Sequence, residues 1–228
     1  MIKRFRLIFP LVTVMAVVGA TEARAVSITL EGPANLGGTG KGTVLGVLSL
    51  ADSGAGNGNP EVGSTAWNGT SATFTGNTSD QQHFFSRSVA ELAAVPITNS
   101  FGLIFQVSEN GPDQALDLNS LAVTFFAANG NTLFSGLYTG PVTLSGVGQG
   151  SSGWLFNVTL TDAERILFFA NANNHVGVAA NITDAGGASD NFFAVTGAGD
   201  IAATPEPASL VLLGSGLGFA AFRLRRKR

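Results

Sequence analysis

Each end of this 228-residue chain carries an apolar segment beside basic residues. The first segment, residues 7–20, follows a basic start and leads into Ala23, Arg24 and Ala25, the small-x-small pattern of a signal-peptidase site. We expect cleavage between Ala25 and Val26, which makes residues 1–25 a signal helix that the Sec machinery exports and a peptidase removes. A retained membrane helix is the alternative, but the run is short for a span of about 20 residues.

The second apolar segment closes the chain. It begins with Pro205, Glu206 and Pro207, continues as the apolar run 208–222 and ends in basic residues. The largest apolar side chains of the run are Leu210, Val211, Leu212, Leu213, Phe219 and Phe222, and the basic end comprises Arg223, Arg225, Arg226, Lys227 and Arg228. An amphipathic helix packed on a domain would need a polar face, which this run lacks. With basic residues on its cytoplasmic side, we expect residues 208–224 to be a single transmembrane helix, preceded by a linker at 198–204.

The tail as a whole resembles the PEP-CTERM sorting signal, and the resemblance covers about residues 204–228. It implies a substrate of exosortase, a membrane-embedded cysteine protease or transpeptidase of Gram-negative bacteria that make exopolysaccharide. Residues 205–207 would then be the recognition motif, and the basic end a cytoplasmic retention signal. The implied route is anchorage in the inner membrane facing the periplasm, followed by transfer to the cell surface or the extracellular matrix. A secreted protein on this route would have the membrane, exosortase and exopolysaccharide as partners.

Residues 26–204 have a composition that excludes several classes of function. All but two of the chain's 15 acidic residues lie there, with only Lys41, Arg87 and Arg165 as basic residues. Because an acidic surface repels nucleic acid, we expect no nucleic-acid partner. The chain contains no cysteine. This rules out disulfides, thiol catalysis and thiolate metal sites.

Short segments of alternating polarity, bounded by Gly, Asn and Ser, predict β-strands. In the clearest one, residues 100–108, Phe101, Leu103, Phe105 and Val107 share one face. The other predicted strands are 27–30, 43–50, 67–75, 83–86, 118–127, 132–138, 142–144, 154–160, 176–182 and 191–195, with 51–63 predicted as a loop, 129–131 as a hairpin turn, 88–94 as a helix and 161–164 as a helix-capping box. We therefore expect residues 26–197 to form an all-β ectodomain, a β-sandwich of jelly-roll or immunoglobulin-like type.

No group of residues in the sequence predicts catalysis. His83 and His175 are the only histidines and lie in different segments, and no Gly-x-Ser-x-Gly motif precedes a helix. We expect a protein that is not an enzyme and holds no metal or other cofactor. Two acidic loops, 109–117 and 184–191, keep calcium open as an alternative. The same Asp and Asn residues also serve turns, which is the interpretation we favour.

These features lead us to expect a structural or adhesive component of the cell surface or the exopolysaccharide matrix. A carbohydrate-binding module is the alternative, with Trp67, Trp154 or Tyr138 as stacking platforms for sugars, although each of them could equally pack in the core. Ice binding would need a regular ladder of threonines, and Thr73 and Thr75 are too few for one. An unrecognised enzyme is the remaining alternative.

Overall fold

The computed structural model describes residues 26–35, 45–51, 59–93, 101–108, 115–146, 152–186 and 188–196. Within these ranges the chain forms eleven strands and two short helices, which confirms an all-β domain. The elements are β1 (Ser27–Asn35), β2 (Leu45–Leu50), β3 (Asn59–Trp67), β4 (Ala72–Gly76), β5 (Arg87–Ser88), α1 (Val89–Ala93), β6 (Phe101–Gln106), β7 (Ala115–Phe126), β8 (Thr132–Ser145), β9 (Ser152–Thr159), α2 (Asp162–Phe169), β10 (His175–Ala185) and β11 (Asp190–Thr196). Neither helix of the described ranges has the length and apolarity that a membrane crossing requires.

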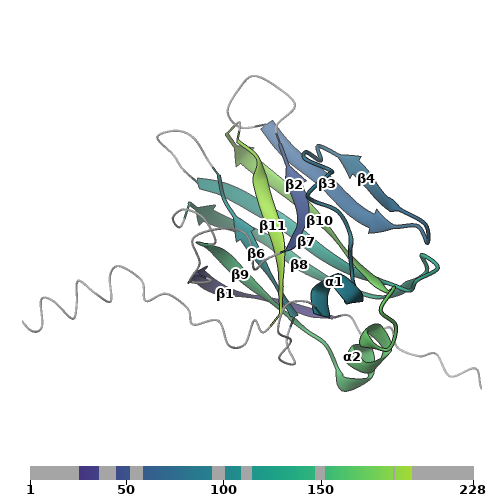
Figure 1. Ribbon diagram of the computed structural model, residues 1–228. Coiled ribbons are helices and arrows are strands. Elements are labelled where there is room, and N and C mark those ends of the chain that lie inside the picture. Colours follow the sequence, from purple (N-terminus) through teal and green to yellow (C-terminus); the bar gives the residue numbers. More distant parts are fainter. Residues whose placement is uncertain are drawn as a thin grey trace, which may run out of the picture.

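The strands form two antiparallel sheets (Figure 1). Sheet I has the order β1-β9-β6-β11-β2, and sheet II has the order β4-β3-β10-β7-β8, with β5 added beside β10. Four of the pairs are nested in the sequence: β7 with β8, β6 with β9, β3 with β10, and β2 with β11. The nested pairs alternate between sheet II and sheet I. The chain can therefore be described as one long antiparallel hairpin whose tip is the pair β7 and β8. Successive strand pairs along this hairpin belong alternately to sheet II and sheet I.

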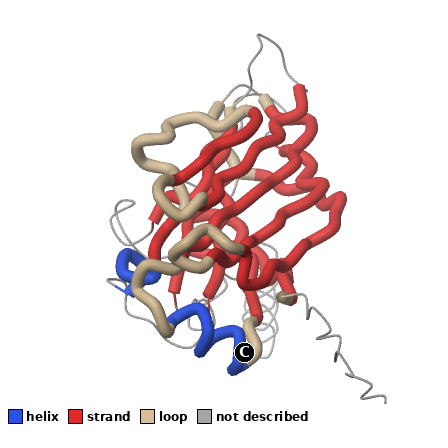
Figure 2. Tube along the Cα trace, turned by 90° about the vertical axis from the view of Figure 1, so that its right-hand side faces the viewer, coloured by secondary structure: helices blue, strands red, loops and turns tan. Residues whose placement is uncertain are grey.

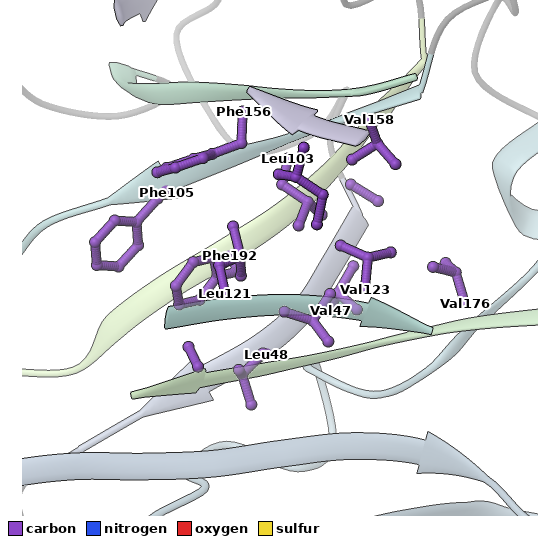
Figure 3. Packing of buried hydrophobic residues seen from close by; sticks show 14 of the residues in the cluster. Val47, Leu48, Leu103, Phe105, Leu121, Val123, Phe156, Val158, Val176 and Phe192 are labelled. Atoms are coloured by element: carbon purple, nitrogen blue, oxygen red, sulfur yellow. The ribbon is translucent and has the colours of Figure 1, made fainter. Parts of the chain in front are cut away.

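The hydrophobic core lies between the two sheets. Figure 3 shows Phe105 and Phe156 of sheet I near Leu121 and Val123 of sheet II, and all four side chains are fully buried. The Phe105 ring stacks on Phe192, with 4.2 Å between ring centroids and 9° between planes. Since no cysteine is present, burial of these large side chains must supply most of the stability of the domain.

A second, smaller core covers the outer face of sheet I. It consists of Ala34, Phe84, Ile104, Leu155, Phe193 and Val195. Phe84 comes from the turn between β4 and β5, and its ring lies over Gly46 of β2. A Cβ atom at Gly46 would sit 2.7 Å from this ring, so the glycine makes room for it. This turn therefore covers part of the outer face of sheet I, while Thr29 and Thr159 near the β1 edge stay exposed.

Most of the predicted strands are present, and some predictions are wrong. Residues 83–86 form part of the turn that carries Phe84, and residues 68–71 interrupt the predicted strand 67–75. The predicted loop 51–63 gives way to β3 at Asn59. Residues 142–144 are continuous with β8. The predicted helix 88–94 and the capping box of α2 at Thr161 and Glu164 are confirmed.

Candidate functional site

The outer face of sheet II is open to solvent, whereas that of sheet I is partly covered. Side chains alternate across a strand, so in β7 the buried Leu121 and Val123 face the core while their neighbours face outward. We call the outward side chains of sheet II the hydroxyl face. It comprises Val62, Ser64, Ala66, Thr73, Thr75, Asp117, Asn119, Ser120, Ala122, Thr124, Ser135, Leu137, Thr139, Thr143, Ala179, Asn181 and Thr183, all of which are exposed or half-buried. Figures 1 and 2 show the strands that carry it.

Strand register places these side chains in rows. One row runs through Thr75, Ser64, Ala179, Ala122 and Leu137 across all five long strands. Neighbouring strands lie about 4.8 Å apart, so the row is about 20 Å wide. The face thus offers a broad surface built mostly from small side chains.

Hydrogen bonds between strands hold several of these side chains in place. The Ser64 and Thr75 hydroxyls are 2.7 Å apart, and Asn119 Nδ2 donates to Thr183 Oγ1 at 3.0 Å. A hydroxyl has one donor and two acceptor positions, so each of these groups keeps capacity for a further bond. The face therefore presents donors and acceptors whose positions are fixed before any ligand arrives.

The hydroxyl face is almost free of charge. Its charged residues are Asp117 and, near the end of β10, the exposed Asp184, and Asp117 Oδ1 accepts a hydrogen bond from Thr143 Oγ1 at 2.6 Å. Soluble protein surfaces commonly carry about 25–35% charged residues. Two exposed aliphatic side chains, Val62 and Leu137, add apolar contact area. Hydroxyls, amides and methyl groups without charge suit an uncharged, hydroxyl-rich ligand better than an ionic one.

An aromatic pair lies where β3 ends and β10 begins. The Trp67 and His175 rings are stacked, with 3.7 Å between centroids and 6° between planes. Trp67 Nε1 donates to the carbonyl of Ala128 at 3.0 Å. His175 Nδ1 is 2.9 Å from the carbonyl of Asn173 and must donate to it, because a carbonyl only accepts. Alternation along β10 puts His175 on the same side of the sheet as Ala179, but alternation along β3 puts Trp67 on the side opposite Ser64, so the pair lies at the ends of these two strands and is not part of the hydroxyl face.

Burial lowers the pKa of His175, because the imidazolium loses hydration. The Asn173 carbonyl and the negative charge of Glu91 act in the opposite direction and are outweighed. His175 is therefore neutral at pH 7 and contributes a flat uncharged ring.

Arg87 is a structural residue rather than a ligand-binding cation. Its Nε donates to the Gly46 carbonyl at 2.7 Å, its Nη2 donates to the His83 carbonyl, and its Nη1 donates to Glu91 Oε1 at 3.0 Å. The guanidinium also lies 3.7 Å from the centroid of the Phe85 ring. Arg87 thereby ties α1 to β2 and to the turn that covers sheet I.

Glu91 completes this arrangement. Burial raises its pKa, but hydrogen bonds from the backbone and hydroxyl of Ser88 and from Arg87 outweigh that effect, so the pKa of Glu91 is lowered. The carboxylate therefore remains charged opposite Arg87 at neutral pH and serves to hold α1 in place.

The other aromatic candidates pack on the core. The Tyr138 ring meets Phe156 edge-on at 5.3 Å between centroids. Trp154 also packs on the core, and its Nε1 donates to the Ser145 carbonyl at 2.8 Å. Of the three predicted platforms, Trp67 alone lies outside this packing, at the end of β3.

The candidate metal and catalytic residues do not come together. His83 pairs with Asp80 at 2.7 Å on the surface, in the turn before β5, whereas His175 stacks on Trp67 at the start of β10. The described ranges contain no group of three His, Asp or Glu side chains that could hold a metal ion. In the second acidic loop, Asp190 accepts a hydrogen bond from the Ser108 backbone, and Asp184 adopts a left-handed turn conformation with φ of 59°. In the first acidic loop, residues 109–114 lie outside the described ranges.

Residues 203–227 match the PEP-CTERM protein-sorting motif. The chain carries a PEP-CTERM sorting signal. This confirms the resemblance inferred from the sequence and marks an exported protein that exosortase processes. No curated protein and no solved structure matches the chain.

The sorting signal itself lies outside the described residues. So do residues 1–25 with the predicted cleavage positions Ala23 and Ala25, the linker 198–204, the predicted transmembrane helix 208–224 and the basic end. Val26, the expected first residue of the exported form, is described and is buried at the start of the domain. The predicted helix at 208–224 and its orientation stay predictions.

Proposed function

We propose that this protein is a non-catalytic structural or adhesive component of the cell surface or exopolysaccharide matrix, and that the hydroxyl face is its adhesive surface. The sorting motif at 203–227 supports the route to that location. The observation that carries the role is a five-strand face with few charged residues, in a chain whose charge is otherwise strongly acidic between its two ends. Such a face can approach a neutral polymer without desolvating ions.

The fold supports an extended adhesive surface. We propose that the domain is a jelly roll, one of the two sandwich types that the sequence predicts. The support is the nesting of β2–β11, β3–β10, β6–β9 and β7–β8 in alternating sheets, which is how a long hairpin rolls into two sheets. Because β3, β10, β7 and β8 lie side by side in this arrangement, residues far apart in the sequence share one face.

We propose that the ligand is an uncharged polysaccharide. Each hydroxyl or amide of the face contributes little to the free energy of binding by itself, since a hydrogen bond to a ligand replaces one to water. Many such contacts along one polymer add up, because each new contact is intramolecular once the first has formed. The arrangement favours avid binding to a polymer over tight binding to a single sugar.

A charge placed on the face tests the adhesive role. Thr139→Lys puts a cation in the row formed with Ser120 and Asn181, and Gln82→Lys makes the same charge change at an exposed site in the turn after β4. We expect the exported domain to co-sediment with cellulose or cross-linked dextran, the Thr139→Lys variant to lose most of this binding, and Gln82→Lys to retain it. Equal binding by both variants would exclude the face, and stronger binding of Thr139→Lys to alginate would indicate an acidic polymer.

Truncation tests the route independently. We propose that the tail first anchors the protein in the inner membrane with the domain in the periplasm. Deleting residues 205–228 should then move the protein from the envelope to the periplasm or the medium. Fractionation unchanged by the deletion would show that the tail does not determine location.

A carbohydrate-binding module for short sugars is the second candidate, and the stacked Trp67–His175 pair favours it. Aromatic rings suit the apolar faces of sugars, as they suit other flat groups. A glycan array separates the two proposals, because a module would select individual oligosaccharides, whereas an adhesive face would give flat signals there and still bind the insoluble polymers.

A further inference from the structure

Both ends of the described domain lie at one end of the two sheets. At the C-terminus, Thr196 of β11 pairs with Phe101, and Phe101 pairs with Val158 near the end of β9. At the N-terminus, Ser27 pairs with Thr159, the last residue of β9. Helix α2 begins three residues later, and α1 contacts β11. Figure 1 shows the two helices at this same end, which we call the helical end.

The sorting tail leaves the domain from the helical end. Eleven residues separate Thr196 from the apolar run that begins at Ala208. Even fully extended, a connection of this length spans at most about 40 Å. The 12 residues of β7 also span about 40 Å, measured along the strand from one end of the sheets toward the other. While the tail is in the membrane, this connection keeps the helical end within about 40 Å of the lipid.

Helix α2 presents two aliphatic side chains at this end. Ile166 is 63% exposed and Leu167 is 50% exposed, whereas the next residue, Phe168, is fully buried. The Phe168 ring contacts Phe125 edge-on at 4.8 Å and fixes the rotation of the helix. Rotation of α2 cannot bury the aliphatic pair without withdrawing Phe168 from the core.

The residues that follow this pair are uncharged, whereas Asp162, one helical turn before Ile166, is an exposed carboxylate. Residues 166–173 contain no Asp, Glu, Lys or Arg. The charged side chains in the first turn of α2 interact with groups of the same turn. Asp162 pairs with Arg165 at 3.3 Å, and Glu164 forms the capping box with Thr161. The helical end thus has an apolar pair beside the charged first turn of α2, which is the pattern of an amphipathic helix at a lipid interface.

We propose that Ile166 and Leu167 insert into the interface of the membrane that holds the tail. Two half-exposed side chains are too few to bind a free domain to lipid. The tether raises the effective concentration of the interface, so a weak contact becomes populated. The contact orients the domain with its strands pointing away from the membrane and leaves the hydroxyl face accessible from the side. Because the domain is acidic, the contact is strongest with neutral lipid.

The test uses the whole anchored protein. It is produced in a bacterial host without exosortase, isolated from membranes and reconstituted in phosphatidylcholine vesicles. Since the chain has no cysteine, Ile166→Cys provides a single site for a fluorescent label. Leu137→Cys is the matched control, because Leu137 is a similarly exposed aliphatic residue, 61% exposed, on the hydroxyl face. Flotation with the vesicles establishes the anchor separately.

We expect a lipid-attached quencher to quench the Ile166→Cys label several-fold more than the Leu137→Cys label, and aqueous iodide to show the reverse. Part replacement by anionic phosphatidylglycerol should reduce the difference. Equal quenching of the two labels would overturn the inference. Shielding of the Ile166→Cys label from iodide without lipid quenching would do the same, since it would indicate a protein partner. A chain that does not float would remove the anchor and the inference with it, while binding to cellulose or dextran would still test the proposed adhesive role.

Discussion

Sheet I and sheet II differ in how they treat their outer faces. In sheet I, the first five residues of β6 are all buried, and Ile104 belongs with Phe84 to the second core on the side that faces away from the central core. In sheet II, β8 alternates between inward and exposed residues along its length. Sheet I thus buries residues on both of its faces, whereas sheet II buries residues mainly on the face toward the core. The face that packing leaves free is the face on which we place function.

The largest effect is expected where both sheets meet. Phe105→Ala should reduce the free energy of unfolding by about 3–5 kcal/mol, because it leaves a cavity beside Phe192 in the central core. Urea unfolding followed by circular dichroism measures it. Since the total stability of a domain is about 5–15 kcal/mol, a loss below about 1 kcal/mol would contradict the central position of Phe105.

A pair of variants compares the two outer faces directly. Phe193→Ala, on the outer face of sheet I, should cost about 3 kcal/mol, because Phe193 is 4% exposed. Leu137→Ala, on the outer face of sheet II, should change the free energy of unfolding by less than about 0.5 kcal/mol. Thermal unfolding of the two variants side by side gives the difference. Similar costs would show that the outer faces are not distinct.

A smaller effect is expected at the stacked Trp67–His175 pair and depends on pH. The pKa of His175 is lowered in the folded state, so the unfolded chain binds more protons as the pH falls below about 6.5. This residue therefore makes the domain lose stability from about pH 6.5 downward, until the folded pKa is passed. His175→Phe keeps a ring against Trp67 and removes the titration. Stability measured between pH 8 and pH 5 should fall less steeply in the variant, and identical slopes would count against this assignment.

The smallest effect on stability is expected on the hydroxyl face. Thr139→Lys should leave the free energy of unfolding within about 0.5 kcal/mol of the unmodified protein, because Thr139 is exposed. The same variant is expected to lose polysaccharide binding. A large loss of stability would show that Thr139 has a packing role, and its binding result would then say nothing about adhesion.

The sequence predicted the strands better than the surfaces they form. Alternation located β6, β8 and β9, because each strand buries one set of large residues. It missed the start of β3, because Pro60, Glu61 and Gly63 are not residues that predict a strand. Glu61 in particular faces inward and is fully buried, which its charge does not predict. The turn at Phe84 was predicted as a strand because it contains adjacent aromatic residues. In the structure, Phe84 packs on the outer face of sheet I, and the turn does not pair as a strand.

The candidate site could not be predicted because it depends on register between distant segments. Ser64, Ala122 and Ala179 lie in one row only because β10 pairs with both β3 and β7. Bulges in β7 and β10 then change which residues face outward, as at Leu118 and Ser120. The sorting tail, in contrast, is a contiguous motif, and its type was evident from the sequence.

The nesting of the strand pairs has a consequence for the timing of export. The last strand, β11, lies between β6 and β2, so the edge strand β2 has no partner in sheet I until β11 arrives. A chain that crosses a membrane from its N-terminus delivers β11 last, only a few residues ahead of the sorting motif at 203–227. The domain can therefore complete its core only when the tail has reached the membrane. The sorting signal thus reaches the membrane at nearly the same time as the domain completes its core. A chain that is only partly exported lacks both the completed core and the exported signal.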